Sequence, residues 1–357
     1  MSASLGFLRR TAARVSCRSV HSSRGLLWDE IRTHNHPGDF TNPNLSTPQT
    51  VAVIGAPMTH GQPLLGTDFG PDMLRNGGLH GVITDLGWCV EETGNLQFRA
   101  PSSSDPQIDP KYGRAKRSFA VGNGLKQIAE VVEKKAQEGK FCLVLGGDHT
   151  IGAGSLAGIL KVHPDAGIIW VDAHADINTP ETTESGNMHG MPISFLMQGL
   201  VDPARVPGFE WLVDGPILKP EQLVYIGLRD VDSGERRIIK ELGIKAFSMQ
   251  SVDKYGIGKT MEMALDHLCG KKARPIHMSY DIDAVDPIDA PSTGTRVRGG
   301  LTWREANYVA EAAAESNLLI GLDMVEVNPS LAPGKGAAIT VDMALLLIGS
   351  ALGNRIL

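Results

Sequence analysis

The sequence of 357 residues predicts an α/β protein of three layers, in which helices cover both faces of a central, mostly parallel sheet. Two observations predict this fold. Short apolar segments that end in Gly or Asp alternate with longer amphipathic segments of helical period. Three of the apolar segments are followed directly by Asp and His, as expected where parallel strands end at a shared edge that binds a ligand.

The N-terminal residues 1–28 differ in composition from the rest of the chain. Residues 1–24 contain five Arg, many Ser and no acid. This composition is typical of an organellar transit peptide, and the Arg content favours the mitochondrion; a disordered basic tail is the alternative. Without those five arginines the formal net charge falls from −6 to −11. We therefore expect a protein of the mitochondrial matrix whose acidic surface argues against nucleic acid and suits a cationic substrate.

The remaining chain is expected to form one catalytic domain, residues 50–357, after a flexible, Pro- and Asn-rich lead-in at 29–49. Buried strands are predicted at 51–55, 141–145, 167–171, 222–226 and 275–280, with a further strand-like segment at 318–325. Helices are predicted at 116–138, 149–162, 188–199, 234–242, 260–268, 302–315 and 339–352. Residues 91–112 are expected to form a long connection near the sheet edge. No apolar run approaches the roughly 18 residues of a membrane span, so no membrane partner is expected.

Three clusters of Asp and His follow predicted strands. Residues 146–149 read Gly-Gly-Asp-His, residues 172–176 read Asp-Ala-His-Ala-Asp, and residues 281–283 read Asp-Ile-Asp. In a parallel sheet all three meet at one edge. Taken alone, Asp148 is equally well explained as a helix cap, and the third cluster as a solvated turn. Burying the three ionisable groups of 172–176 is costly without a cation to pair them.

The donors of these clusters suit a pair of divalent cations. Carboxylates favour hard cations such as Mn²⁺, and imidazole tolerates Mn²⁺, Fe²⁺ or Co²⁺. A structural zinc site would instead want Cys and a closed tetrahedron. Two ions bridged by carboxylates lower the pKa of a shared water and deliver hydroxide at neutral pH. The sequence therefore predicts a two-metal hydrolytic site.

Further acids are expected around the same edge. Glu326 follows the strand-like segment at 318–325, and three acids lie in residues 230–235, for which a solvated loop is the alternative. An acidic rim suits a cationic group, whereas a phosphoryl substrate would call for Arg or Lys. His189 lies in a Gly-rich loop and can serve as a proton shuttle because its unperturbed pKa is near neutral. A lone His in such a loop is more often incidental.

Five motifs together resemble the arginase branch of the ureohydrolase family. They are GGDH at 146–149, DAHADINTPETTESGNMHG at 172–190, YIGLRDVDSGE at 225–235, SYDIDAVDP at 279–287 and GLDMVEVNP at 321–329. The similarity runs from residue 51 to the C-terminus. It implies the three-layer fold that arginases share with deacetylases, two Mn²⁺ per subunit, and a homotrimer or homohexamer. The implied activity is hydrolysis of L-arginine to L-ornithine and urea, as in arginine catabolism and the urea cycle, by a metal-bridging hydroxide that attacks the guanidinium carbon.

The resemblance also implies a role for each matching residue. One Mn²⁺ would be held by His149, Asp172, Asp176 and Asp281, and the second by Asp172, His174, Asp281 and Asp283. Asp176 would relay the proton of the hydroxide, His189 would exchange protons with solvent and the leaving amine, and Glu326 would pair with the guanidinium. The implied substrate-binding residues are Asn178, Ser185, Asn187, Asp232, Glu235 and Thr295.

Two positions depart from the family pattern, and three rival functions remain. Leu64 stands where a basic residue is common, and Arg296 stands where Pro is usual. An agmatinase-type ureohydrolase shares the metal ligands, but its substrate has no α-carboxylate, so the SGNMHG loop at 185–190 and Asp232 argue against it. The Lys-poor rim argues against a two-metal phosphatase. A catalytically silent regulatory subunit would usually lose a metal ligand, and none is lost here.

Overall fold

The computed structural model describes residues 42–46, 48–270 and 272–355. The predicted transit peptide and the lead-in up to residue 41 therefore lie outside the described residues. At the end of the lead-in, Asn42 Nδ2 donates a hydrogen bond of 2.7 Å to the carbonyl of Leu319, and Ser46 N donates one of 2.7 Å to the carbonyl of Gly139. Within the described ranges, none of the helices combines the length and the apolar character needed to cross a bilayer.

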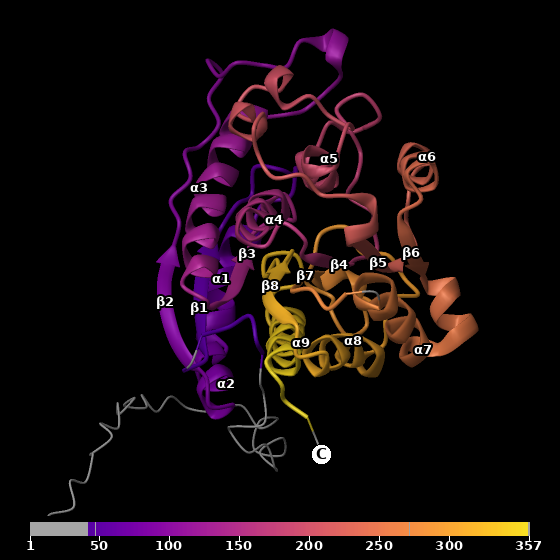
Figure 1. Ribbon diagram of the computed structural model, residues 1–357. Coiled ribbons are helices and arrows are strands. Elements are labelled where there is room, and N and C mark those ends of the chain that lie inside the picture. The colour runs from indigo at the N-terminus through magenta and orange to yellow at the C-terminus, as the bar shows by residue number, and fades with distance from the viewer. Residues whose placement is uncertain (1–41, 47, 271, 356–357) are drawn as a thin grey trace, which may run out of the picture. The chain divides into compact units, whose positions relative to one another are not determined.

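The described residues form a parallel sheet of eight strands in the order β2-β1-β3-β8-β7-β4-β5-β6, which can be followed from left to right in Figure 1. The strands are β1 (Thr50–Ala56), β2 (Cys89–Asn95), β3 (Phe141–Gly146), β4 (Gly167–Val171), β5 (Leu223–Leu228), β6 (Lys245–Ser248), β7 (Ile276–Asp281) and β8 (Leu319–Val325). Every pairing is parallel. The order places β8, the last of these strands in the chain, between β3 and β7.

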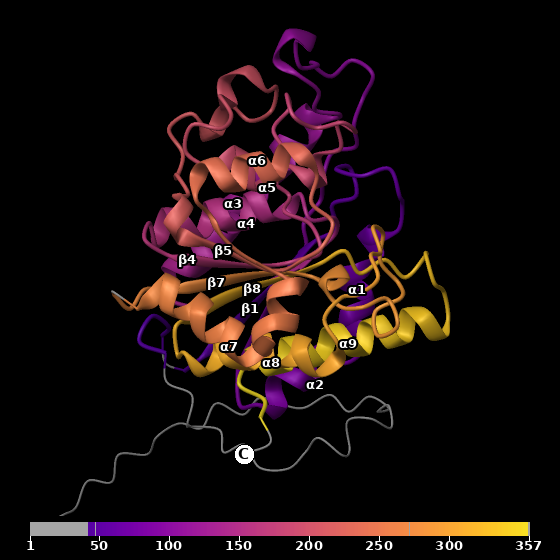
Figure 2. The same ribbon diagram turned by 90° about the vertical axis from the view of Figure 1, so that its right-hand side faces the viewer.

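Helices cover both faces of the sheet (Figure 2). One layer contains α3 (Ser118–Gln137), α4 (Ile151–Val162), α5 (Pro192–Leu196) and α6 (Ser233–Leu242). The other contains α1 (Gly70–Asn76), α2 (Leu79–Asp85), α7 (Met249–Cys269), α8 (Trp303–Glu315) and α9 (Lys335–Ala351). The predicted three-layer architecture is confirmed, and the sheet is parallel throughout.

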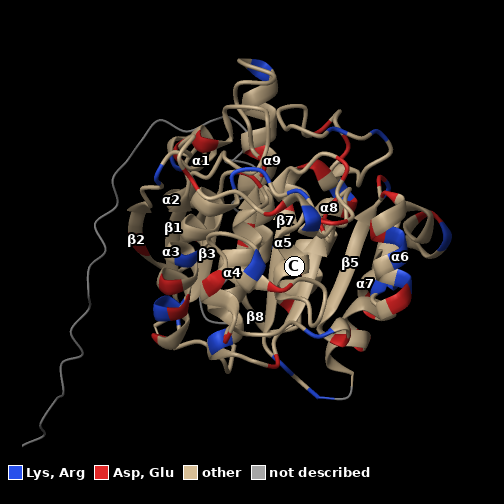
Figure 3. Ribbon diagram, turned by 90° about the horizontal axis from the view of Figure 1, so that it is seen from above, with Lys and Arg blue, Asp and Glu red and all other residues tan. Residues whose placement is uncertain are grey.

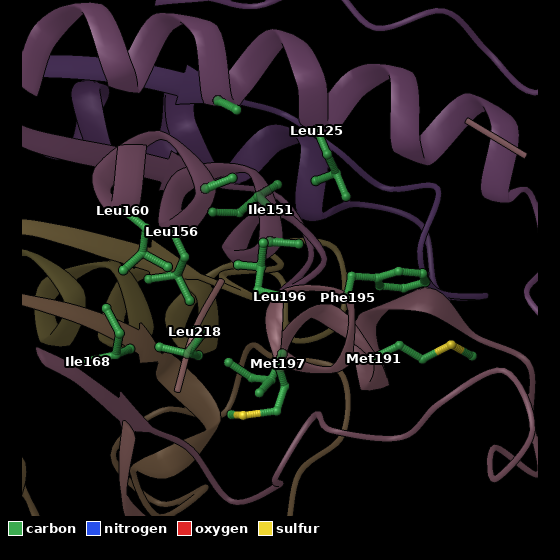
Figure 4. Close-up of a cluster of buried hydrophobic side chains, with 14 of the residues drawn as sticks. Leu125, Ile151, Leu156, Leu160, Ile168, Met191, Phe195, Leu196, Met197 and Leu218 are labelled. Carbon is green, nitrogen blue, oxygen red and sulfur yellow. The ribbon is translucent and has the colours of Figure 1, made fainter. Parts of the chain in front are cut away.

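The core explains why the central strands read as continuous apolar runs. β3, β4, β7 and β8 are buried along their whole lengths because helices cover both of their faces. Figure 4 shows a cluster of buried apolar side chains in this core, which includes Leu125 of α3, Leu156 of α4 and Leu196 of α5. Each such side chain stabilises the fold by roughly 1.5–3 kcal/mol when fully buried.

Both edge strands escaped prediction. The expectation of a connection over 91–112 was wrong at its start, because β2 occupies Cys89–Asn95 and, among the described strands, pairs with β1 alone. Its sequence Cys-Val-Glu-Glu-Thr-Gly-Asn is polar, as edge strands often are, since charges there discourage pairing with other chains. At the opposite edge, β6 has only four residues and gives no periodic signal.

Several helix boundaries also differ from expectation. The helix predicted at 188–199 is instead a 3₁₀ turn at Met188–Gly190 followed by the five-residue α5, which begins at Pro192. α7 starts at Met249, well before the predicted residue 260, and is interrupted at Gly256, whose φ is 75°. A positive φ of this kind favours glycine and breaks the helical period that the prediction relied on. The short helices α1 and α2 were not predicted.

Candidate metal centre

Four adjacent strands carry the predicted clusters at their carboxyl ends. β3, β8, β7 and β4 are neighbours in the sheet. The residues that follow or end them are His149 after β3, Glu326 after β8, Asp281 and Asp283 at β7, and Asp172, His174 and Asp176 after β4. Segments that are more than 170 residues apart in the chain thus meet at one edge, as the strand-end argument predicted.

The first group of ligand atoms surrounds His149. Its Nδ1 lies 2.9 Å from Asp172 Oδ2, 3.3 Å from Asp176 Oδ2 and 3.2 Å from Asp281 Oδ2. All four side chains are buried. Three carboxyl groups facing one imidazole nitrogen bring more negative charge together than that nitrogen can balance, and buried charges of this kind are usually paired with a cation.

The second group surrounds His174. Its Nδ1 lies 3.2 Å from Asp172 Oδ1 and 3.2 Å from Asp283 Oδ2. The ligand atoms of each group, one with His149, Asp172 and Asp176 and one with Asp172, His174 and Asp283, lie within 4.8 Å of one another. Asp172 belongs to both groups and turns one oxygen toward each imidazole. The arrangement therefore offers two neighbouring ion positions that share a carboxylate.

The electrostatics of these acids follow from crowding and burial. Burial raises the pKa of Asp176 well above its usual value, and the charge of Asp172 raises it further. The pKa of Asp281 is raised by burial and by the charges of Asp283 and Asp172. For Asp172, burial acts upward, but the neighbouring imidazoles of His149 and His174 outweigh it and hold the pKa below its usual value. These carboxyl groups resist full ionisation together unless a cation joins them.

Two site residues have a strained backbone. Asp176 and Glu326 have φ values of 51° and 62°, in the left-handed region that residues with a Cβ rarely adopt. Each lies just beyond a strand of the central sheet, where a left-handed residue turns the chain sharply. Such strain costs about 1–3 kcal/mol per residue and is often found at functional sites.

Glu326 is held by donors on both oxygens. Oε1 accepts a hydrogen bond of 2.9 Å from the backbone N–H of His149, and Oε2 accepts one of 2.7 Å from Gln62 Nε2. His189 Nδ1 lies 3.6 Å from Oε1. Burial lowers the pKa of His189, but the nearby carboxylate of Glu326 outweighs this and raises it above its usual value. The structure therefore brings two predicted catalytic residues together and adds Gln62, which sequence reasoning missed.

A second group of predicted residues gathers at the start of α6. Asn178 Nδ2 donates a 2.7 Å hydrogen bond to Asp232 Oδ2. Asp232 caps the helix by accepting from Glu235 N at 2.9 Å, and Glu235 Oε1 accepts from the backbone N–H of Ile177 at 3.2 Å. Burial, reinforced by the charge of Asp232, raises the pKa of Glu235 to about 7. Beyond this capped end, α6 carries both basic and acidic residues, as Figure 3 shows.

The other predicted residues lie in loops. Thr295 Oγ1 donates to Asp283 Oδ2 at 3.0 Å and so contacts the candidate metal ligands. Ser185 is exposed, and its Oγ accepts from the backbone N–H of Asn187 at 3.1 Å. The departure Leu64 is 39 % exposed, and Arg296 Nη1 donates to the carbonyl of Pro291 at 3.2 Å.

The carboxyl group of Asp148 contacts the backbone of two loops beside the site. This buried group accepts hydrogen bonds from the backbone N–H groups of Thr150 at 3.1 Å and Gly61 at 2.7 Å. It therefore joins residues 60–61 and 148–150 beside the site. Ser279 and Asp323, which lie behind His149, were missed, although a polar residue inside an otherwise apolar buried strand was a signal that could have found them.

The fold and the site together place this chain in a class of protein. It is an α/β protein whose wholly parallel sheet carries a candidate two-metal site, formed by two adjacent His/Asp groups, at its strand ends. The family model described as the arginase family matches residues 49–353. The chain belongs to the arginase family. The earlier expectations of an arginase-like fold and of an enzyme of this family are thereby confirmed.

Individual relatives agree with this assignment. An arginase of Glaciozyma antarctica is 50% identical over 319 residues, which cover 89% of this chain and 91% of the relative. The rat protein named "Arginase-2, mitochondrial" is 46% identical over 85% of each chain, and proteins named arginase-1 match at 46–48% identity. The arginase of Bacillus caldovelox superimposes with a TM-score of 0.78 at 36% identity, covering 87% of this chain and all of that one. Since both named types match at similar identity, the mitochondrial type is not distinguished.

Proposed function

We propose that this chain is a manganese-dependent arginase that hydrolyses L-arginine to L-ornithine and urea. The observation that carries the proposal is the pair of His/Asp groups that share Asp172, with Glu326 beside His149 in a protein of the arginase family. A family assignment alone would leave open whether this chain had lost its ligands. Here all six predicted ligand side chains gather at one edge of the sheet.

The donor set suits two Mn²⁺ ions. His149, Asp172, Asp176 and Asp281 would hold one, and Asp172, His174, Asp281 and Asp283 the other. The donors are carboxylate oxygens and two imidazole nitrogens, a combination that hard divalent ions such as Mn²⁺ accept. Their mutual repulsion, described above, is what such ions would relieve. When bound, two such ions supply hydroxide at neutral pH by lowering the pKa of a shared water.

Three further residues bind the guanidinium of the substrate or transfer protons. Glu326 pairs with the guanidinium of arginine, and its two hydrogen-bond donors, His149 N and Gln62 Nε2, hold its carboxylate in place for this task. Asp176 accepts the proton of the attacking water. His189, whose side chain is 18% exposed, exchanges protons between solvent and the leaving amine.

The amino-acid end of the substrate binds at the acidic and amide groups of the rim. Asn178 and Ser185 contact the α-carboxylate, with Asn187 in the same loop, and Asp232 binds the α-amino group. Glu235 supports Asp232 through the α6 capping box. Thr295 lines the pocket through its hydrogen bond to Asp283.

The proposal is tested by measuring urea release from L-arginine and from agmatine together with metal content. Arginine-dependent release with about two Mn²⁺ per subunit is expected. Release of urea from agmatine alone would refute the arginase proposal in favour of agmatinase. A structure titled as a hypothetical agmatinase from Burkholderia thailandensis is similar at only 22% identity with a TM-score of 0.62, which supports a shared fold alone.

The proposed function also includes the location of the protein in the cell and its oligomeric state. Residues 1–28 direct the protein to the mitochondrial matrix, where it contributes to arginine catabolism and the urea cycle. Fusing these residues to a fluorescent protein tests this, and a diffuse cytoplasmic signal would contradict it. The subunits assemble as homotrimers or homohexamers, which light scattering coupled to size-exclusion chromatography distinguishes from a monomer.

A further inference from the structure

A buried chain of polar side chains lies behind His149, on the side away from the carboxyl groups of the metal site. His149 Nε2 lies 3.0 Å from Ser279 Oγ. Ser279 Oγ donates to Asp323 Oδ2 at 3.0 Å, and Ser155 Oγ donates to the same oxygen at 2.6 Å. His277 Nε2 lies 3.1 Å from the other carboxyl oxygen, Oδ1. All five side chains have exposed fractions of 0%.

The sheet register explains how this chain is assembled. Ser279 of β7 pairs with Asp323 of the neighbouring strand β8. His277, Ser279 and Asp281 alternate along β7 and so lie on the same face of the sheet. One strand therefore supplies both a metal ligand, Asp281, and the hydroxyl group that contacts another ligand, His149. Ser155 reaches the same carboxyl group from α4.

The directions of these hydrogen bonds determine which ring nitrogen of His149 carries the hydrogen. A serine hydroxyl has one hydrogen to donate, and Ser279 donates it to Asp323. Its oxygen is then left to accept from His149 Nε2–H. In a neutral imidazole with hydrogen on Nε2, the lone pair is on Nδ1, which is the nitrogen that faces Asp172, Asp176 and Asp281.

We infer that Asp323, acting through Ser279, is a positioning residue that fixes the tautomer and orientation of His149 for metal binding. This inference rests on the proposed metal site. Ligating histidines commonly donate their second ring N–H to a neighbouring group, and loss of that group typically weakens metal binding or activity 10- to 100-fold. Here the acceptor is the hydroxyl oxygen of Ser279, which donates its own hydrogen to the buried carboxyl group of Asp323.

The neighbouring rings support the same role. Trp170 stacks on His149 with ring centroids 3.9 Å apart and planes 6° from parallel, so the ring plane is fixed as well as its hydrogen bond. Gly152 makes room for this stack, because a Cβ there would lie 2.8 Å from the indole ring. Gly321 makes room for His277 in the same way, since its Cβ would lie 2.7 Å from His277 Nδ1.

The test compares Mn²⁺ affinity in full-length variants. Apoprotein is prepared by chelation, Mn²⁺ is titrated against a competing fluorescent chelator, and bound metal is counted by mass spectrometry. Ser279→Ala is expected to weaken binding of one of the two ions by roughly 10- to 100-fold. Asp323→Ala should do the same, because Ser279 can then donate to His149 Nε2 and favour the wrong tautomer.

Two further variants separate positioning from simple stability. Asp323→Asn is expected to restore most of the affinity, because its amide oxygen can still accept from Ser279 while its NH₂ faces His277. Ser155→Ala is the matched control: it also removes a hydroxyl donor to Asp323 and should bind Mn²⁺ like the wild type. The melting temperature of each apoprotein is recorded in parallel.

The outcomes are distinct. Wild-type affinity in Ser279→Ala overturns the inference, and so does Asp323→Asn if it loses affinity as fully as Asp323→Ala. If Asp323→Ala fails to fold, Ser279→Ala and Asp323→Asn decide the question. If the wild-type chain itself binds no Mn²⁺, the proposed function fails rather than this inference alone.

Discussion

Replacing Glu326 with Gln removes a charge from the site while keeping the shape of the side chain. In the proposed reaction, Glu326 binds the guanidinium of arginine. A hydrogen bond to a charged group contributes about 1.5–3 kcal/mol. Since each 1.36 kcal/mol is a factor of ten, kcat/KM for arginine should fall roughly 10- to 100-fold.

The same substitution should also lower stability, because Glu326 makes hydrogen bonds within the protein itself. Both oxygens of Glu326 accept hydrogen bonds, one from His149 N and one from Gln62 Nε2. An amide has only one oxygen, so whichever way the substituted side chain turns, its NH₂ group faces a donor. An unsatisfied buried pair of this kind costs about 1–3 kcal/mol of the free energy of unfolding.

Steady-state urea release and chemical denaturation measure these two effects separately. Asp230→Asn is the matched control, because Asp230 carries the same charge at the same rim but its side chain is 68% exposed and 4.0 Å from His174 Nε2. We expect the control to stay within about threefold of the wild type, because exposed ion pairs contribute little. A Glu326→Gln enzyme with wild-type kcat/KM would refute the assigned role of this carboxylate.

Four further predictions concern other residues of the site and its surroundings. Asp172→Ala should abolish both metal uptake and turnover, since Asp172 contacts both imidazoles; activity retained in the variant would contradict the site assignment. His189→Asn should slow turnover strongly while metal content, measured by mass spectrometry, stays near that of the wild type; loss of metal would indicate a structural role. Gly152→Ala should lower the free energy of unfolding, measured by urea denaturation, by about 1–3 kcal/mol, because the new Cβ would overlap Trp170. Gly81→Ala in α2 is the control: a Cβ there meets nothing within 4 Å, so the free energy of unfolding should stay the same or rise. Burial raises the pKa of Glu235 from 4.5 to about 7, so its contribution to stability is complete below pH 4.5 and is lost as the pH rises through 7. The Glu235→Gln apoprotein should therefore lose less stability than the wild type between these pH values. If the free energy of unfolding of both proteins changes with pH at the same slope, Glu235 does not titrate there.

The sequence predicted the parts of the structure that depend on burial and strand ends. β3 and β4 were found to within one residue because both faces are buried and the apolar run is unbroken. The convergence of the proposed metal ligands followed from those strands, since the carboxyl ends of parallel strands meet. The resemblance to a family then supplied the proposed substrate-binding residues, which spacing alone could not assign.

Other features depend on contacts that no local pattern encodes. Gln62 reaches Glu326 across 264 positions in the chain, and Ser279 meets Asp323 only because β8 pairs with β7 in one particular register. The edge strand β2 looks like a loop because it is polar and needs only one neighbour. These features are set by tertiary packing rather than by propensity.

The place of β8 in the sheet has a consequence for folding. β8 is the last strand in chain order, yet it is inserted between β3 and β7, which lead to His149 and Asp281. Until β8 is in place, these two strands have no common neighbour to hold their ends at the right spacing. Pairings between distant segments form slowly because loop entropy must be lost first. The capacity to bind metal should therefore appear only late in folding, and metal binding can serve as a stringent measure of how much of a preparation has reached the native state.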